Sequence, residues 1–170
     1  MLVVFGGLPG TGKTALSRPF AEESGAVYLR IDTIEQALRE SSGLGDDVGA
    51  AGYEIAYGLA RDNLRLGRTV IADSVNPIAI TRNAWRDLAA EVGAPIVEVE
   101  VVCSDKAEHR RRVETRRGDI AGLKLPVWDE IAMREYETWD RPHLILDTAR
   151  ITPAQALEEL RRQVDARLLR

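Results

Sequence analysis

The most constraining feature of the 170-residue chain is a glycine-rich run near its N-terminus, Gly7-Leu8-Pro9-Gly10-Thr11-Gly12-Lys13-Thr14. It follows the short apolar run 2–5, which predicts a buried strand, and it precedes a predicted helix over 12–25. In this strand-to-helix context the spacing is typical of a loop whose backbone N–H groups point inward at phosphate. We therefore expect a phosphate-binding loop here.

Each polar group of the run has an expected role. Lys13 should place its charge on the β and γ phosphates of a nucleotide, and the Thr14 hydroxyl should bind Mg²⁺. The amide of Ala15, at the start of the helix, adds to the positive potential of the loop. The chain lacks the Asn-Lys-x-Asp sequence that usually accompanies guanine selectivity, which favours ATP. The alternative interpretation is a glycine-rich turn with a surface lysine.

Beyond the loop, the chain alternates between apolar runs and amphipathic stretches. Strands are predicted at 2–5, 26–31, 69–72, 96–103 and 143–146. Helices are predicted at 12–25, from 32, at 50–66, around 78–92, at 104–117, at 128–139 and from 153, with loops at 41–49 and 118–126. This order predicts an α/β fold with a parallel sheet and right-handed crossovers, and the length fits one domain.

Composition excludes several classes of protein. Lys and Arg number 23 against 27 Asp and Glu, and the net charge of −4 argues against binding nucleic acid through the overall field. The single cysteine, Cys103, can form neither an internal disulfide nor a multi-cysteine zinc site. No apolar run is long enough for a membrane span or a signal peptide, so we expect a cytoplasmic protein with no membrane partner.

Two carboxylates are predicted to follow strands. The carboxyl ends of parallel strands face the ligand crevice, and a carboxylate at Asp32 could accept a proton from a hydroxyl. Alternatively, Asp32 caps the next helix together with Glu35. Asp73 ends an apolar run as a magnesium-binding aspartate would, although a plain turn before a helix starting at Asn76-Pro77 is the alternative.

The tract 109–117 is strongly basic and is predicted to lie on a helix. Arg112 and Arg116 are one turn apart and should share a face. That spacing would allow one guanidinium to stack on adenine while the other reaches the transferring phosphate. The remaining arginines of the tract are expected to form a solvated face, and a wholly solvated face is the alternative interpretation of the tract.

Four segments together resemble the small P-loop kinases, in particular the group of zeta toxin, chloramphenicol phosphotransferase and the polynucleotide 5′-kinases. The segments are GGLPGTGKT, RIDTIEQALR, IADSVNPIAITR and HRRRVETRR, and the resemblance covers nearly the whole chain. Only the first segment is specific by itself, and the others support it by their order and spacing. The resemblance implies a single kinase domain over 1–170, sheet order 2-3-1-4-5, and a small lid at about 112–128.

The same resemblance implies roles for individual residues. It implies that Asp32 faces the acceptor hydroxyl and that Arg112 and Arg116 act from the lid on the nucleotide and on the transferring phosphate. It further implies that Asp73 contacts magnesium or substrate. For Arg82 it suggests an active-site contact, whereas a solvated helix face is the ordinary interpretation.

The expected activity is therefore ATP-dependent, Mg²⁺-requiring transfer of the γ-phosphate to a hydroxyl of a small molecule, with an acceptor pocket at 41–57. A polynucleotide 5′-hydroxyl kinase is one alternative, but it should have a basic groove, and residues 33–60 contain Arg39 as their only Lys or Arg. An ATP-binding regulatory module without an acceptor is the other. The acceptor's identity and the oligomeric state do not follow from the sequence.

Overall fold

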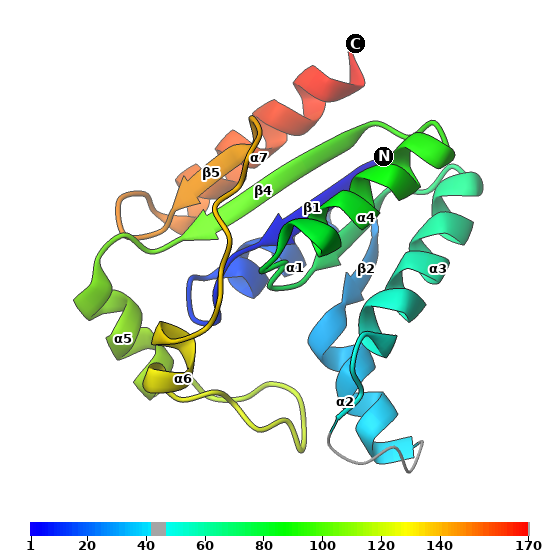
Figure 1. The fold of residues 1–170 in the computed structure, drawn as a ribbon. Coiled ribbons are helices and arrows are strands. Elements are labelled where there is room, and N and C mark those ends of the chain that lie inside the picture. Colours follow the sequence, from blue (N-terminus) through cyan, green and yellow to red (C-terminus); the bar gives the residue numbers. More distant parts are fainter. Residues whose placement is uncertain (42–46, 170) are drawn as a thin grey trace.

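A computed structural model describes residues 1–41 and 47–169 of the chain. Its centre is a five-stranded parallel sheet in the order β2-β3-β1-β4-β5 (Figure 1). The strands are β1 (Leu2–Gly6), β2 (Val27–Arg30), β3 (Val70–Asp73), β4 (Ile96–Val102) and β5 (Leu144–Asp147). The predicted fold class and the expected sheet order are confirmed.

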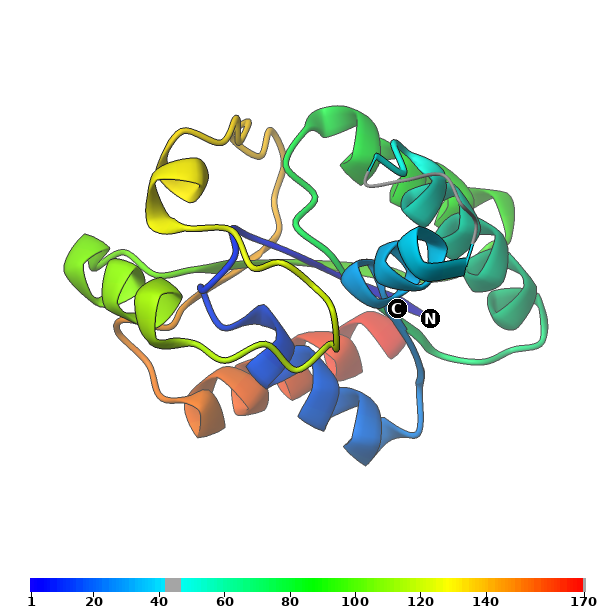
Figure 2. The same ribbon diagram turned by 90° about the horizontal axis from the view of Figure 1, so that it is seen from below.

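Helices lie on both faces of the sheet. They are α1 (Lys13–Ser24), α2 (Ile31–Ser41), α3 (Ala51–Arg65), α4 (Ala79–Glu91), α5 (Lys106–Thr115), α6 (Trp128–Ala132) and α7 (Pro153–Leu168). Helices α1 and α7 cover one face, and α3 and α4 cover the other (Figure 2). Among the described residues, no helix has both the length and the apolar character needed to cross a membrane.

The alternation of side chains along β1 divides the core into two layers. Val3 and Phe5 pack toward α1 and α7, whereas Leu2 and Val4 pack toward α3 and α4, and all four are essentially inaccessible to solvent. Each such side chain contributes about 1.5–3 kcal/mol through burial. Strand β1 is therefore fixed at the centre of the sheet, and the loop that follows it is held at the carboxyl edge.

Two helices begin within two residues of their predicted starts. Helix α2 begins at Ile31, so Asp32 lies in its first turn instead of capping it from outside. A carboxylate in that turn is still stabilised by the helix dipole. Helix α5 begins at Lys106 and not at 104, because Asp105 caps it: the Asp105 carboxylate accepts hydrogen bonds from the amides of Ala107 and Glu108 at 2.9 and 3.0 Å.

The basic helix is shorter than predicted. Helix α5 ends at Thr115, and Arg116 has an extended backbone with ψ of 147°. The amide of Arg116 still donates to the carbonyl of Arg112 at 3.0 Å, and both side chains line the same cavity, so the two arginines lie one turn apart as predicted. The Arg116 guanidinium reaches across the following loop, where Nη2 donates to the carbonyl of Pro126 at 3.1 Å.

The predicted helix 128–139 is also shortened, because α6 ends at Ala132. Beyond it the chain is held by α4 and by the residues just before that helix: the amide of Glu137 donates to the carbonyl of Pro77 at 2.8 Å, and Arg82 of α4 donates to the Glu137 carbonyl at 3.0 Å. Trp139 is buried close to β1. These tertiary contacts replace the helical hydrogen bonds that the local pattern predicts.

Candidate active site

The glycine-rich loop between β1 and α1 has the backbone that its sequence predicts. Gly7 has φ of +131°, and a Cβ there would lie 2.1 Å from the carbonyl oxygen of Val101. Gly10 has φ of +86°, and a Cβ there would lie 2.6 Å from the Val113 side chain. Both positions therefore require glycine, which allows the loop to turn tightly in front of α1.

Lys13 points from the first residue of α1 back over this loop. Its side chain is almost fully buried, and Nζ donates to the Leu8 carbonyl at 3.1 Å. Burial lowers the pKa of the Lys13 ammonium, whereas the carboxylates of Asp73 and Asp32 oppose that shift. The cation is thus held between the loop and two acidic side chains, with Arg116 also close enough to lower its pKa.

Asp73, at the end of β3, is a buried carboxylate that receives three hydroxyl groups at one oxygen. Its Oδ2 accepts from Thr14 at 2.8 Å, from Ser17 at 2.9 Å and from Tyr28 at 2.6 Å. Burial, followed by the charge of Asp73, raises the pKa of the Tyr28 phenol, which keeps it protonated as a donor. Sequence reasoning missed Ser17 and Tyr28; the position of Ser17 one turn after Thr14 was the available signal.

The pair of Thr14 and Asp73 fits a magnesium ion that shares its ligands with phosphate. Both side chains offer oxygen, which Mg²⁺ prefers, and Mg²⁺ usually takes one or two protein ligands together with phosphate oxygens and water. Among the described residues there is no group of three or more His, Cys, Asp or Glu that could hold a metal alone. The residues therefore suit a metal that arrives with the nucleotide.

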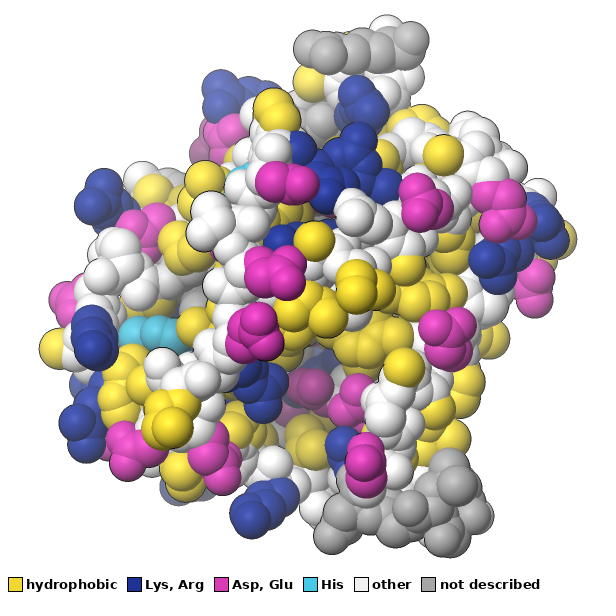
Figure 3. Space-filling view, viewed as in Figure 1, with side chains coloured by type: hydrophobic (Ala, Val, Ile, Leu, Met, Phe, Trp, Pro, Cys, Tyr) yellow, Lys and Arg dark blue, Asp and Glu magenta, His cyan; other side chains and the backbone are white. Residues whose placement is uncertain are grey.

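A cavity of about 500 Å³ opens beside the loop, a volume in the usual range for small-ligand sites. Figure 3 shows the molecule hollowed in this region, with charged side chains of both signs around it. The cationic residues in its walls are Lys13, Arg30, Arg39, Arg112, Arg116, Arg117, Lys124 and Arg134. The acidic residues are Asp32, Glu35, Asp73 and Asp119.

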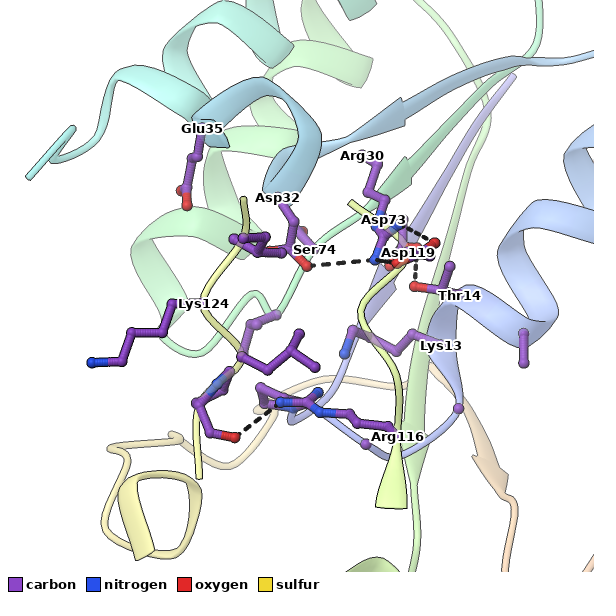
Figure 4. A pocket seen from close by; sticks show the side chains of 18 of the residues that line it. Lys13, Thr14, Arg30, Asp32, Glu35, Asp73, Ser74, Arg116, Asp119 and Lys124 are labelled. Atoms are coloured by element: carbon purple, nitrogen blue, oxygen red, sulfur yellow. Dashed lines mark hydrogen bonds and ion pairs between the residues drawn. The ribbon is translucent and has the colours of Figure 1, made fainter. Parts of the chain in front are cut away.

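Asp32, Lys13 and Arg116 lie around the same cavity, as the sequence predicted (Figure 4). The Asp32 carboxylate is about half exposed, at 51%, and faces this space. Burial lowers the pKa of the Arg116 guanidinium, while the Asp32 carboxylate opposes this shift across the cavity. One carboxylate and two cations therefore surround one space at the carboxyl edge of the sheet.

Arg112 is held at the rim of the cavity by two partners. Its Nε donates to Glu108 at 2.7 Å, and its Nη1 and Nη2 donate to the hydroxyl and carbonyl of Thr148 at 2.7 and 3.0 Å. The Thr148 hydroxyl donates in turn to the Thr11 carbonyl of the phosphate loop at 2.7 Å. Thr148 thus links Arg112 to the loop, and no sequence signal identified it.

An ion-paired cluster on the opposite side of the cavity was also missed. Asp119 lies in the loop 116–127 between α5 and α6, which corresponds to most of the expected lid. Its carboxylate forms a bidentate ion pair with Arg30, whose Nη1 and Nη2 donate to Oδ2 and Oδ1 at 2.7 and 3.0 Å. Oδ2 also accepts a hydrogen bond from Nη2 of Arg18 in α1 at 2.6 Å. The loop is therefore fastened to the end of β2 and to α1.

Two sequence predictions about neighbouring residues are corrected. Arg82 is neither solvated nor in the cavity: it is 2% exposed, binds the Glu137 carbonyl and lies 5.1 Å from the centre of a Trp139 ring. Residues 41 and 47–57 do not line the cavity, because α3 packs behind α2; residues 42–46 lie outside the described residues. Arg39 is the only cation of residues 33–60 that lines the cavity, and further cations come from β2 and the loop 116–127.

An AAA-domain family, AAA_33, matches residues 2–135, a range that contains the phosphate loop, Asp32, Asp73 and Arg116. The chain belongs to this family. The matched range contains the glycine-rich loop and the residues that line the cavity, whereas β5, α7 and Thr148 follow it. The narrower resemblance to zeta toxin, chloramphenicol phosphotransferase and polynucleotide kinases stays a prediction.

Similar proteins agree with a nucleotide-binding kinase fold. An uncharacterized protein of Mycobacterium tuberculosis is 31% identical over 161 residues, which cover 87% of this chain and 32% of that protein. The chain thus spans about a third of the length of its mycobacterial relatives. The crystal structure of APE1195 is 26% identical with a TM-score of 0.71, covering 98% of this chain and 95% of that one. The M. tuberculosis APS kinase CysC in complex with AMPPNP and APS is 22% identical with a TM-score of 0.64, covering 94% and 95%.

Proposed function

We propose that the chain is an ATP-dependent kinase that transfers the γ-phosphate to a hydroxyl of a small molecule. The observation that carries the proposal is the arrangement of Lys13, Asp32 and Arg116 around one cavity beside the phosphate loop. The similarity to an APS kinase structure with AMPPNP and APS supports the same kind of reaction.

The phosphate loop holds the nucleotide in this proposal. The backbone N–H groups of residues 7–15, except that of Pro9, which has none, surround the β and γ phosphates, and Lys13 adds a full charge that no other side chain of the loop can supply. Thr14, oriented by Asp73, binds Mg²⁺, which when present neutralises charge on the phosphate oxygens. Arg112, held by Thr148, borders the loop and binds the base of ATP.

Asp32 prepares the acceptor. Its exposed carboxylate accepts the hydroxyl proton as the acceptor oxygen forms a bond to the γ phosphorus and the bond to the bridging oxygen of ADP breaks. The electron pair of the broken bond leaves on ADP. Arg116 stabilises the negative charge that develops on the transferring group, an effect available only while the charge is present.

The cavity argues against the polynucleotide alternative. Single-stranded nucleic acid is bound along a basic groove that follows many phosphates, whereas the cations here line one cavity of about 500 Å³ that also contains four acidic residues. The regulatory alternative requires no acceptor base, and the exposed Asp32 beside Lys13 and Arg116 is what favours the enzyme over it.

A screen of acceptors tests the proposal. ADP formation from Mg·ATP should rise above the background rate with at least one member of a panel of aminoglycosides, nucleosides, sugars, sugar acids, sugar phosphates and 5′-hydroxyl oligonucleotides. The rise should vanish in Lys13→Ala. Stimulation by oligonucleotides alone would favour the polynucleotide kinase, and the absence of any stimulation would favour the regulatory module.

A further inference from the structure

Arg30 lines the cavity, but the proposed reaction gives it no role. It ends β2, its side chain is 11% exposed, and its Nη2 lies 4.0 Å from the carboxylate of Asp32. Its Nε is buried and has no hydrogen-bond partner in the part of the chain that the structure describes. The guanidinium fork is therefore held by the fold next to Asp32, the group proposed to prepare the acceptor (Figure 4).

The fork is bound to a carboxylate that the loop 116–127 supplies. Asp119 receives both Nη atoms of Arg30, in the two-pronged geometry that arginine also uses for free carboxylates and phosphates. The Asp119 side chain is 43% exposed, so it lies where the cavity meets solvent and not in the core. An anion entering the cavity could therefore take its place without opening the fold.

We propose that Arg30 binds an anionic group of the acceptor, a carboxylate or a phosphate, and that Asp119 occupies the same guanidinium until the acceptor displaces it. This inference rests on the proposed kinase function and names its substrate class. After Arg30 has exchanged partners, Arg18 of α1 still holds the loop 116–127, because its guanidinium binds the Asp119 carboxylate at 2.6 Å.

The position of Arg30 explains why an anion would help transfer. An acceptor whose anionic group is bound by Arg30, with Nη2 of that arginine 4.0 Å from the Asp32 carboxylate, has its hydroxyls confined to the neighbourhood of Asp32 and of Lys13. Lys124 and Arg134, in the same cavity wall, add positive potential at its open side. A neutral acceptor would gain nothing from these three cations.

Matched acceptors give the first test. D-Ribose 5-phosphate and D-gluconate should accept phosphate from Mg·ATP with kcat/KM roughly tenfold or more above D-ribose and D-sorbitol, the factor expected for one charge-assisted contact. The two anions distinguish a phosphate from a carboxylate as the preferred group. Equal use of the neutral and anionic members would overturn the inference while leaving the kinase function intact.

Three variants give the second test, which needs no turnover. With the protein saturated by Mg·AMPPNP, sodium sulfate should raise the melting temperature of the wild type more than that of Arg30→Gln. Asp119→Asn should respond to lower sulfate concentrations than the wild type, because it removes the competing charge. Arg161→Gln, which removes an exposed ion pair with Glu23 outside the cavity, should respond as the wild type does and reports the nonspecific effect of sulfate.

The outcomes separate the two claims. A sulfate response that is identical in the wild type and Arg30→Gln would contradict the anion site. A weaker response in Asp119→Asn would mean that Asp119 supports the site and does not compete for it. A normal sulfate pattern without transfer to any acceptor would retain the anion site and contradict the kinase.

Discussion

The Thr14 hydroxyl donates a hydrogen bond to the Asp73 carboxylate at 2.8 Å, although 59 residues separate them in the chain. This contact joins the start of α1 to the end of β3. The two lie close together because α1 follows β1 across the phosphate loop and β1 pairs with β3. It fixes the position of the Asp73 carboxylate relative to the phosphate loop and orients the hydroxyl that we expect to bind Mg²⁺.

Replacement of Lys13 tests the nucleotide site. Lys13→Ala should abolish measurable ATP turnover and weaken ATP binding, because the buried ammonium is the one full charge that the loop supplies to the β and γ phosphates. Isothermal titration with ATP measures the affinity. Lys106→Ala, on the exposed first turn of α5, is the matched control and should bind as the wild type does. Unchanged affinity in Lys13→Ala would remove the phosphate-loop assignment.

Replacement of Asp32 separates chemistry from helix stabilisation. Asp32→Asn keeps the size of the side chain but cannot take a proton, so transfer should fall by roughly 100-fold or more. The melting temperature should change by only about a few degrees, because the site is half exposed and a first-turn charge is worth about 0.3–1 kcal/mol. Asp87→Asn on the exposed side of α4 should alter neither quantity. A large loss of stability with normal activity per folded molecule would favour a structural role.

The two cavity arginines near α5 should differ in their kinetics. Arg116→Ala should lower kcat far more than it weakens ATP binding, by roughly 1000-fold if it acts as arginines do in related phosphoryl transfers. Arg112→Ala should instead raise the KM for ATP and spare kcat, because Arg112 is tied through Thr148 to the phosphate loop. Equal small effects would withdraw both assignments.

Controls for this pair lie on the same helix. Arg110 and Arg111 are exposed and bind Glu114 and Glu108 on the surface of α5. Their alanine variants should leave kcat and the KM for ATP within about twofold, since exposed ion pairs contribute little. A loss comparable to that of Arg116→Ala would show that the helix acts as a general electrostatic surface.

The pairing of Asp119 predicts a pH-dependent stability. Hydrogen bonds from Arg30 hold the pKa of the Asp119 carboxyl well below its ordinary value of 3.8, with Arg18 adding to the effect. Its contribution is therefore present above pH 3.8 and is lost as the pH falls below that value. The stability difference between wild type and Asp119→Asn, about 1 kcal/mol or less because the pair is partly exposed, should shrink between pH 6 and pH 3. Urea unfolding measures it, and a difference that grows on acidification would contradict the pairing.

Local chemistry in the sequence was enough to predict the fold and the phosphate loop. The run from Gly7 to Thr14 fixes its own backbone through glycine and lies between a strand and a helix, so no distant residue had to be known. The capping box of Thr152 and Gln155, with Pro153 at the first position, likewise predicts the start of α7 as observed.

Features that depend on distant residues could not be predicted. The Arg30–Asp119 pair spans 89 residues and joins a strand end to an irregular loop, so no periodic pattern relates its members. Thr148 has no motif of its own and matters only because Arg112 and the carbonyl of Thr11 meet it. The end of α6 was misjudged for the same reason, because Arg82 binds the following backbone and overrides its helical pattern.

Tracing the γ-phosphate of ATP tests the central claim most directly. Mg·ATP labelled with ³²P at the γ position is incubated with the protein and each acceptor, and the label is separated into organic ester and inorganic phosphate. The proposed kinase places the label in an ester of at least one acceptor, with loss of that product in both Lys13→Ala and Asp32→Asn. Label found only as inorganic phosphate, at the same rate with and without every acceptor, would contradict it.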